Sequence, residues 1–284
     1  RETTLGTFGT SRLALLDSNW EQTLCYRTLY KGAQQIAAAL RKRFAAGSRI
    51  VLWQPDNCSL AQCLLGIILA DCVAVPLCAT TCNEHISEWS AYYRWDAVIS
   101  TTLDSTNSDL HETCSALNAP ILSPELLHKE GAHLHYSPSS PVTAASRPAL
   151  LFLYEGSKHT LLSQANITAH AHQLQLHCDY EGRDICFNLA GIHTPLGCHM
   201  GFFLPLLHGV PIVLHSHEQQ KVTTVMDCIY NSRSTILVCH GTWLQNNTSD
   251  INCAHSVRPL RSIYHDNPQM SYSIRTHWQA QAQA

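Results

Sequence analysis

The sequence predicts an α/β protein built from layered, mostly parallel sheets flanked by helices. Along nearly the whole chain of 284 residues, stretches with helical apolar spacing alternate with short apolar runs typical of buried strands. This alternation indicates parallel sheets, because a strand reaches its parallel neighbour through a crossover that is usually a helix. Hydrophobic residues make up 45% of the chain, which is enough to cover both faces of such sheets.

The first predicted lobe covers residues 1–121. Its clearest element is a helix over residues 27–44, with one apolar face formed by Leu29, Ala33, Ile36, Ala37, Leu40 and Phe44. Gly47 and Ser48 end that helix, and the apolar runs that follow predict strands at residues 49–53, 73–76 and 97–99. A second helix is expected between the first two of these strands, from residue 57 to residue 70.

Residues 122–148 are rich in serine, proline and histidine, which predicts a surface connection. A second α/β lobe is expected over residues 149–284. Its strands are predicted at residues 150–154, 185–189, 211–214, 235–238 and 261–264. Its helices are predicted at residues 163–177, 198–208 and 221–230, followed by a short helix from Thr242 and a helical tail.

Parallel sheets bind ligands beyond the carboxyl ends of their strands. The segments that follow the predicted strands of the second lobe are therefore expected to form one rim. They are residues 155–160, 190–196, 239–243 and 265–268.

Composition excludes several classes of function. The net charge is −3, and no basic cluster exceeds Arg41-Lys42-Arg43, so the chain lacks the electrostatic footprint of a nucleic-acid-binding protein. The longest apolar run, residues 63–78, contains Asp71 and is too short to span a bilayer, so no transmembrane segment is expected. Without a recognisable leader, a cytoplasmic protein is expected.

Thirteen cysteines are present without any Cys-x-x-Cys pair. That absence removes the commonest zinc and redox patterns, and the positions of Cys63, Cys72, Cys186 and Cys239 within apolar runs favour buried, reduced thiols. Cys198-His199 and Cys239-His240 are adjacent pairs, and on a strand adjacent side chains point to opposite faces, which argues against a nucleophilic dyad at the second pair.

Eighteen histidines raise the question of a metal site. The alternating pairs are His133 and His135, His170 and His172, and His215 and His217. None has a third ligand placed by sequence, so no metal site is predicted, and a metal-dependent hydrolase is the least favoured function.

The stretch over residues 150–167 reads as a buried strand, a small polar turn and the start of a helix. Such a layout places backbone N–H groups and a lysine against phosphate. The candidate phosphate-binding residues are Glu155, Gly156, Ser157, Lys158 and Thr160. The turn contains one glycine, where a phosphate cradle usually needs several.

Several segments, taken in order, resemble the large N-terminal domain of the adenylate-forming superfamily, which includes acyl-CoA synthetases, acyl-[acyl-carrier-protein] synthetases, adenylation domains and luciferases. The matching segments are TLCYRTL at 23–29, RIVLWQPDN at 49–57, GIILADCVAVPL at 66–77, GFFLPLLHGVPIVL at 201–214, STILVCHGTWL at 234–244 and LRSI at 260–263. The resemblance covers nearly the whole chain. It implies the family fold, and an ancestry in the activation of carboxylic acids by ATP.

The family's nucleotide motifs are altered here. Its long glycine-rich phosphate loop is shortened to residues 155–158, with Lys158 the sole basic remnant. Alignment through Gly197 puts His193 and Thr194 where the family has an aromatic–His pair, so the catalytic candidates are Lys158, His193 and Thr194. Asp266 and Asn267 stand where the family has an adenine-contacting glycine motif. The resemblance further implies an acyl or aryl pocket lined by His199, Met200, Phe203, Thr242 and Trp243.

The family's later nucleotide-binding strands and its C-terminal domain, which carries the catalytic lysine, have no counterpart in the sequence. The resemblance therefore implies a non-catalytic or partner-dependent homologue that binds an acyl group, an acyl carrier protein or another protein chain. The alternative is an ATP-dependent carboxylic-acid-activating ligase completed by a missing or separate C-terminal part. No cofactor is assigned, and ATP with Mg²⁺ is implied only if activity is retained.

Overall fold

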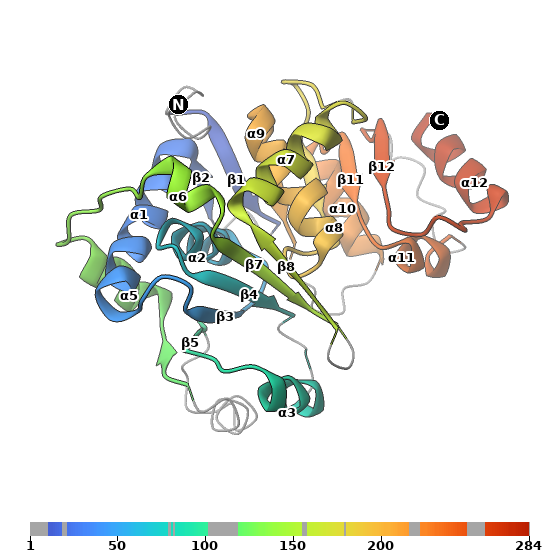
Figure 1. Cartoon of the computed structure of the whole chain (residues 1–284). Coiled ribbons are helices and arrows are strands. Elements are labelled where there is room, and N and C mark those ends of the chain that lie inside the picture. Colours follow the sequence, from blue (N-terminus) through green and yellow to red (C-terminus); the bar gives the residue numbers. More distant parts are fainter. Residues whose placement is uncertain are drawn as a thin grey trace. The chain divides into compact units, whose positions relative to one another are not determined.

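The computed structural model describes residues 11–18, 22–78, 81, 83–101, 119–154, 158–178, 180–215, 222–248 and 259–283. The chain divides into two compact units. Unit 1 contains residues 1–26, 56–58 and 170–284, and unit 2 contains residues 27–55 and 59–169. Each unit is built on its own six-stranded sheet (Figure 1). The predicted class, layered and mostly parallel sheets flanked by helices, is confirmed.

The sheet of unit 2 has the strand order β6-β5-β3-β4-β7-β8. Its strands are β3 (Arg49–Trp53), β4 (Val73–Leu77), β5 (Ala97–Ile99), β6 (Ile121–Leu122), β7 (Pro148–Leu153) and β8 (His159–Ser163). Only β8 runs antiparallel, and it pairs with β7 as a hairpin (Figure 1). The helices are α1 (Tyr26–Arg43), α2 (Cys58–Leu69), α3 (Asn83–Tyr92), α5 (Pro124–Gly131) and α6 (Pro141–Ala145).

Two helices of unit 2, α1 and α3, bury the apolar faces that their sequences present. The apolar face predicted for the first helix is confirmed, because Leu29, Ile36 and Leu40 of α1 are fully buried. Ile86 and Trp89 of α3 pack on the alternate strand residues Val51, Val75 and Val98. Because side chains alternate between the two faces of a strand, every second residue of β3, β4 and β5 reaches this cluster.

The sheet of unit 1 has the order β12-β11-β9-β10-β1-β2. Its strands are β1 (Leu13–Asp17), β2 (Thr23–Cys25), β9 (Cys186–Asn188), β10 (Ile212–Leu214), β11 (Ile236–Val238) and β12 (Ser262–Tyr264), and only β2 is antiparallel to its neighbour. The helices in this part of the chain are α7 (Gln164–Gln175), α8 (Pro195–Cys198), the π-helical turn η2 (His199–Phe203), α9 (Leu204–His208), α10 (Val222–Ser232), α11 (Gly241–Asn246) and α12 (Tyr272–Gln283).

The core of unit 1 lies on both faces of its sheet. Phe187, Leu237 and Ile263 belong to one cluster, with Met226 and Trp278 from the helices. The residues next to them along the strands, Cys186, Val238 and Tyr264, belong to a second cluster, with Met200 and Leu204. Strand residues of successive number thus contribute to opposite clusters, as the pleat requires.

The structure corrects two sequence predictions in unit 2, and the first concerns the predicted connection. Residues 122–148, predicted as a connection, contain β6 in part, α5, α6 and the start of β7. Ser-Pro steps begin both helices: the hydroxyl of Ser123 accepts a hydrogen bond from the Leu126 N–H, and Pro124 and Pro141 take the first helical turn, where an N–H is not needed. The serine and proline enrichment therefore marks helix starts.

The second correction concerns the predicted phosphate turn. The strand at residues 150–154 is followed by a second strand, β8, before helix α7 begins at Gln164. The layout is strand–turn–strand, where strand–turn–helix was expected.

The lobe boundaries also differ from the predicted lobes at 1–121 and 149–284. Residues 11–25 form β1 and β2, and β1 pairs with β10, so the start of the chain joins unit 1. No predicted element covered β1.

Candidate functional site

Three of the four predicted rim segments follow neighbouring strands of one sheet. Residues 190–196 follow β9, residues 239–243 follow β11, and residues 265–268 follow β12, and these three parallel strands are adjacent in unit 1. The fourth segment, residues 155–160, follows β7 of the sheet in unit 2. Since β7 pairs with β4 and β8, this segment does not follow a strand of the same sheet as the other three.

Asn188, at the end of β9, organises the turn that leads into α8. Its side chain is buried, donates a hydrogen bond to the Gly197 carbonyl (3.0 Å) and accepts one from the Gly191 N–H (3.2 Å). Gly191 has φ +79°, a conformation that strongly favours glycine. A Cβ at Gly191 would also lie 2.4 Å from the His193 ring, so no larger residue fits without a shift.

A buried carboxylate, Asp56, holds the same turn. Its Oδ1 accepts a hydrogen bond from the Ile192 N–H (3.0 Å), and its Oδ2 lies 3.5 Å from His193 Nδ1. His193, a catalytic candidate, is therefore a partner of Asp56. Sequence reasoning did not select Asp56 or Asn188 as site residues. The available signal was a polar side chain near the carboxyl end of a predicted strand: Asp56 follows the strand at residues 49–53, and Asn188 lies in the last part of the strand at residues 185–189.

Thr194, the second catalytic candidate of this turn, caps α8. Its hydroxyl accepts a hydrogen bond from the Gly197 N–H (3.1 Å) and lies 3.1 Å from the carbonyl oxygens of both Ala190 and Gly191. This geometry is that of an N-cap residue, with the backbone in the extended region. The described contacts of the hydroxyl are thus all with backbone groups of its own turn.

The predicted pocket residues lie on two faces of the sheet. His199 and Met200 belong to η2, and Met200 joins the cluster with Tyr180, whose hydroxyl donates to the Met200 carbonyl (2.8 Å). Trp243 packs on the opposite cluster, with its ring centroid 5.8 Å from that of Trp278. Phe203 is half-buried, with its ring 6.2 Å from that of His199, and Thr242 is exposed. The structure brings His199, Met200 and Phe203 together, and places Trp243 elsewhere.

His199 is the most perturbed histidine of this region. It is buried, and its ring meets the His170 ring edge-on at 4.5 Å. Burial, and then the neighbouring His170, lower the pKa of His199 to about 4. The side chain is therefore neutral at pH 7. A π-helical turn is often associated with a functional site, and here it spans His199 to Phe203.

Asp266 ties the end of β12 to the start of α11. Its Oδ1 accepts a hydrogen bond from the Gly241 N–H (2.8 Å), and its Oδ2 lies 2.6 Å from His240 Nδ1. Burial alone would raise the pKa of Asp266, but the bonds from Gly241 and His240 hold it below its usual value. Asn267 fills the adjoining space, because a Cβ at Gly241 would lie 2.3 Å from the Asn267 Cβ. Asp266 and Asn267, predicted to stand at the family's glycine motif, thus both contact residues of this chain.

The hairpin of unit 2 carries the remaining candidates. The Tyr154 N–H donates to the Lys158 carbonyl (3.0 Å), so three residues lie between the two bonded positions. The Lys158 side chain is exposed, and the Tyr154 hydroxyl donates to Thr160 Oγ1 (3.3 Å). Trp89 of α3 anchors the hairpin by donating to the Tyr154 carbonyl (3.0 Å). Glu155, Gly156 and Ser157 lie outside the described residues.

The three alternating histidine pairs of the sequence do not form a cluster among the described residues. His133, His135, His170 and His172 are exposed, and His215 is buried against Phe187, while His217 lies outside the described part of the chain. Across the described ranges, no group of three histidine, cysteine, aspartate or glutamate side chains could hold a metal ion. The same ranges contain no helix that is both long and apolar enough to cross a membrane.

Comparisons with known proteins match the sequence to one family model and the structure to one fold. The family model described as "AMP-binding enzyme" matches residues 6–265. The N-terminal subdomain of Klebsiella oxytoca NpsA, in complex with 3-hydroxybenzoyl-AMSN, superimposes with a TM-score of 0.77 at 17% identity, over 96% of this chain and 66% of that one. The chain therefore spans slightly less than two thirds of that structure. No curated protein matches the sequence.

Two further structures show the same fold. An ATP-bound RpMatB–BxBclM chimera has a TM-score of 0.81 at 15% identity, over 98% of this chain and 56% of that one. NpsA–ThdA, an artificially fused adenylation–PCP di-domain from Klebsiella oxytoca, has a TM-score of 0.77 at 16% identity, over 94% of this chain and 48% of that one. At these identities the likeness establishes the fold.

Proposed function

This chain belongs to the AMP-binding enzyme family, and from that premise we propose that it is a non-catalytic or partner-dependent member of it. In this proposal the chain keeps the family scaffold and binds an acyl group, an acyl carrier protein or another protein chain, in the cytoplasm. It does not form an acyl adenylate by itself.

The hairpin between β7 and β8 carries the proposal. Wrapping a triphosphate requires several successive backbone N–H groups that point at the phosphates. Here the N–H of Tyr154 is used by the Lys158 carbonyl, and only three residues remain between them. Lys158 is the one basic residue of this segment, so the charge that would neutralise the phosphates is also small.

Asp266 and Asn267 support the same proposal. The Asp266 carboxylate binds the Gly241 N–H and His240, and its pKa stays low, so it is ionised at pH 7. The resemblance assigns this position to contact with adenine, and here a charged carboxylate and an amide side chain stand where the family has glycine. Adenylation also depends on positioning, which the altered loop and this altered turn both weaken.

The proposed acyl-binding region is the π-helical turn. His199 is held neutral by burial, and it lies beside Met200 and Phe203. A neutral imidazole among a thioether and an aromatic ring suits an apolar chain better than an anion. A carrier-protein partner is consistent with the fused adenylation–PCP di-domain among the similar structures.

The alternative is a ligase completed by a separate C-terminal part. One observation favours testing it: a similar structure is an N-terminal subdomain in complex with 3-hydroxybenzoyl-AMSN. Under this alternative, the chain takes part in ATP-dependent activation of a carboxylic acid once the second part is present, and ATP with Mg²⁺ is then its cofactor.

Isothermal titration with ATP and Mg²⁺ tests the first proposal. We expect no binding in the micromolar range, and no difference between the wild-type chain and Lys158→Ala. Micromolar binding that Lys158→Ala abolishes would contradict the proposal, because the shortened loop would then still hold phosphate. A parallel titration with 3-hydroxybenzoyl-AMSN separates two causes. Binding of this compound without binding of ATP would indicate loss of the phosphate loop alone, and binding of neither would indicate that the acyl pocket is lost as well.

Pyrophosphate exchange tests the alternative. The chain is mixed with a C-terminal domain of an adenylate-forming enzyme, Mg²⁺, ATP and a panel of fatty and aryl acids. Exchange above that of each protein alone would support the ligase. Its absence for every acid removes this alternative and leaves the first proposal standing.

A further inference from the structure

Two segments of unit 1 meet along a contact that is rich in histidine. Residues 170–178 comprise the end of α7 and the turn after it, and residues 195–209 run from α8 to the end of α9. Apart from two buried cysteines, the ionisable side chains of both segments are five histidines, with no aspartate, glutamate, lysine or arginine. The His170 ring meets the His199 ring edge-on, with the centroids 4.5 Å apart. We call this contact the histidine seam.

Histidines face histidines across this seam. Burial, and then the neighbouring His170, lower the pKa of His199 to about 4. Burial, and then the neighbouring His172, lower the pKa of the half-buried His208. Tyr180 also faces the seam, with its ring centroid 6.0 Å from that of His208, and burial raises the pKa of Tyr180 so that it stays uncharged. Within the described residues, the ionisable side chains that act on the charge of His199 and His208 are therefore other histidines.

The segment that carries His170 and His172 is held by few apolar contacts. Of residues 170–177, Ala171 is buried, Leu174 is half-buried, and the other six are exposed. Leu174 packs against the cluster on this face of the sheet. A segment with so little buried apolar surface opens locally at a much lower free energy than the core of the unit. The seam can therefore open while the sheet stays folded.

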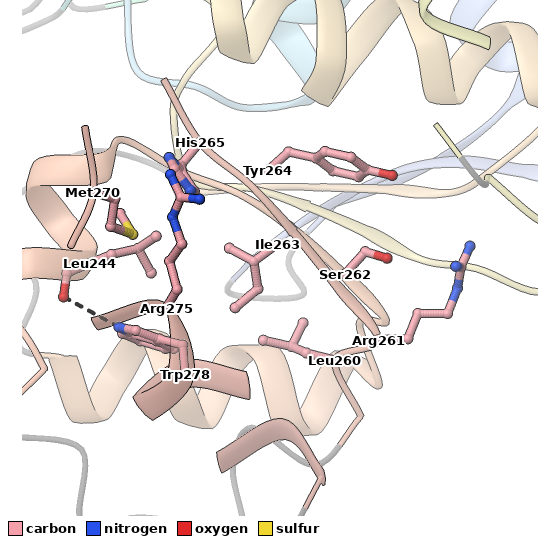
Figure 2. Close-up of a pocket in the computed structure, with 10 residues that line it drawn as sticks. All are labelled: Leu244, Leu260, Arg261, Ser262, Ile263, Tyr264, His265, Met270, Arg275 and Trp278. Carbon is pink, nitrogen blue, oxygen red and sulfur yellow. Dashed lines mark hydrogen bonds between the residues drawn. The ribbon is translucent and has the colours of Figure 1, made fainter. Parts of the chain in front are cut away.

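Cys178 marks the inner side of this segment. Its thiol is buried, lies 4.0 Å from Met200 Sδ and hydrogen-bonds with the Tyr264 side chain. Tyr264 points away from Leu260 and Trp278, which line the pocket beside β12 (Figure 2). The thiol therefore lies on the face of the sheet opposite those two side chains. Opening of the segment would expose it to solvent.

Burial of these histidines makes opening of the seam depend on pH. A histidine that faces water takes up a proton at a pH of about 6.5, whereas the pKa of His199 in the closed seam is about 4. Between these values the open seam binds a proton that the closed seam does not, so closure is favoured above pH 6.5 and is lost as the pH falls towards 4. For His199 alone this difference raises the open fraction about twentyfold between pH 7 and pH 5. The lowered pKa of His208 adds to that effect.

We propose that residues 170–178 form an acid-released cover over the π-helical turn η2. Protonation of the histidines on both sides of the seam separates this segment from residues 195–209 and exposes the turn. Two imidazolium rings that face each other repel, which adds to the cost of burying their charge. The inference gives the turn that we propose to bind an acyl group a means of regulation, and it rests on that proposed role.

Thiol labelling of the whole chain tests the opening. 4,4′-Dithiodipyridine reacts with thiols at acid pH, and mass spectrometry assigns the label to each cysteine. The rate at Cys178 is divided by its rate in the urea-unfolded chain at the same pH, so that the reactivity of the reagent cancels. We expect this ratio to rise at least about tenfold from pH 7 to pH 5. The ratio at Cys63, which is buried in α2 of unit 2, should not change, because the chain as a whole stays folded.

His199→Gln combined with His208→Gln removes the two proton acceptors on the inner side of the seam. In this variant the rise at Cys178 should stay below about threefold, because opening no longer takes up their protons. A ratio at Cys63 equal to that of the wild-type chain shows that the variant is folded. A rise at Cys178 as large as in the wild-type chain would overturn the proposal.

A second variant changes exposed positions alone, so that folding is not at risk. His170→Gln combined with His172→Gln removes the charges on the α7 side and should reduce the rise at Cys178 at least about twofold. The matched control is His133→Gln combined with His135→Gln, which makes the same change at exposed positions of unit 2 and should leave the rise as it is.

Three further results would each overturn the acid-released cover. They are a ratio at Cys178 that does not depend on pH, an equal rise at Cys63, and an unchanged rise in the variant of His170 and His172. The labelling uses no nucleotide and no acyl ligand, so its failure leaves the proposed function intact. Titration with dodecanoate at pH 7 tests the acyl-binding role by itself, and absence of binding would contradict that role while the acid-dependent opening of the seam stands.

Discussion

At the scale of single residues, Asp184 is a buried carboxylate of unit 1 with several hydrogen-bond donors around it. It accepts hydrogen bonds from Arg261, from the Thr235 hydroxyl (2.7 Å) and from the Glu181 N–H (2.6 Å). Burial alone would raise the pKa of Asp184, but these bonds hold it below its usual value. Its charge therefore contributes to stability above pH 4, and that contribution declines as the pH falls through the lowered pKa.

Asp184→Asn should lower the free energy of unfolding by roughly 1–2 kcal/mol, because the buried Asp184 carboxylate accepts charge-assisted hydrogen bonds from the solvent-exposed Arg261, and an amide replaces them only in part. Urea denaturation at pH 7 measures this loss. The control is Arg183→Gln, which breaks the exposed Arg183–Glu181 pair and should cost less than about 0.5 kcal/mol. Equal losses in the two variants would show that burial of Asp184 does not matter.

His199 also makes stability depend on pH, but here the folded state favours the neutral form of the side chain, whereas it favours the charged form of Asp184. Its folded pKa of about 4 lies below the value of about 6.5 for an unfolded histidine, so between these values the unfolded chain binds a proton that the folded chain does not. Stability should fall as the pH drops from 6.5 towards 4, by on the order of 3 kcal/mol for this group alone. His199→Phe should remove that part of the decline, as seen in melting temperatures at pH 7, 6, 5 and 4. His135→Phe, at an exposed position, is the matched control, and an unchanged slope in His199→Phe would contradict the assignment.

At the scale of elements, Thr194 begins a helical stretch that continues from α8 through η2 to α9. Thr194→Ala removes the acceptor for the Gly197 N–H and should cost about 1 kcal/mol, whereas Thr194→Ser keeps the hydroxyl and should cost much less. Chemical denaturation of both variants measures the difference. If serine were as costly as alanine, the methyl group and its packing, and not the cap, would be the cause.

The elements also show which sequence signals were sufficient. Long periodic runs, such as the face of α1 that contains Leu29 and Leu40, were predicted because burial imposes a regular spacing. The strand β8 was not predicted, since HTLLS is short and mixed in polarity, and a turn with one glycine fits a hairpin as well as a helix start. Asp56 and Asn188 were not selected because a buried polar residue is recognised only by the backbone groups it binds, which local sequence does not reveal.

At the scale of the whole molecule, buried thiols are distributed through both units. Seven described cysteines are buried, namely Cys58, Cys63, Cys72, Cys178, Cys186, Cys198 and Cys239. Burial raises the pKa of the Cys63, Cys72 and Cys186 thiols to about 12. The prediction that Cys63, Cys72, Cys186 and Cys239 are buried is confirmed.

Thiol reactivity should therefore report on the fold. In the native protein at pH 8, at least these seven thiols should react slowly with Ellman's reagent, because the thiolate is the reactive form and is disfavoured by burial. In guanidinium chloride all thirteen should react. Rapid reaction of all thirteen in the native state would mean that the two cores open far more often than their burial implies.

The pairing of β1 with β10 has a consequence for synthesis of the chain. Leu15 of β1 pairs with Ile212 of β10, about 200 residues further along. At ribosomal rates of about 5–20 residues per second, β10 is synthesised roughly 10–40 s after β1. Unit 2, which lies almost entirely between the two strands, can form its sheet during that interval. Until β10 emerges, the apolar residues of β1 depend on the β1–β2 hairpin alone, and a short two-stranded hairpin is at best marginally stable in water. β1 is thus made long before it reaches its place in the sheet, and a chaperone has that whole interval in which to bind it.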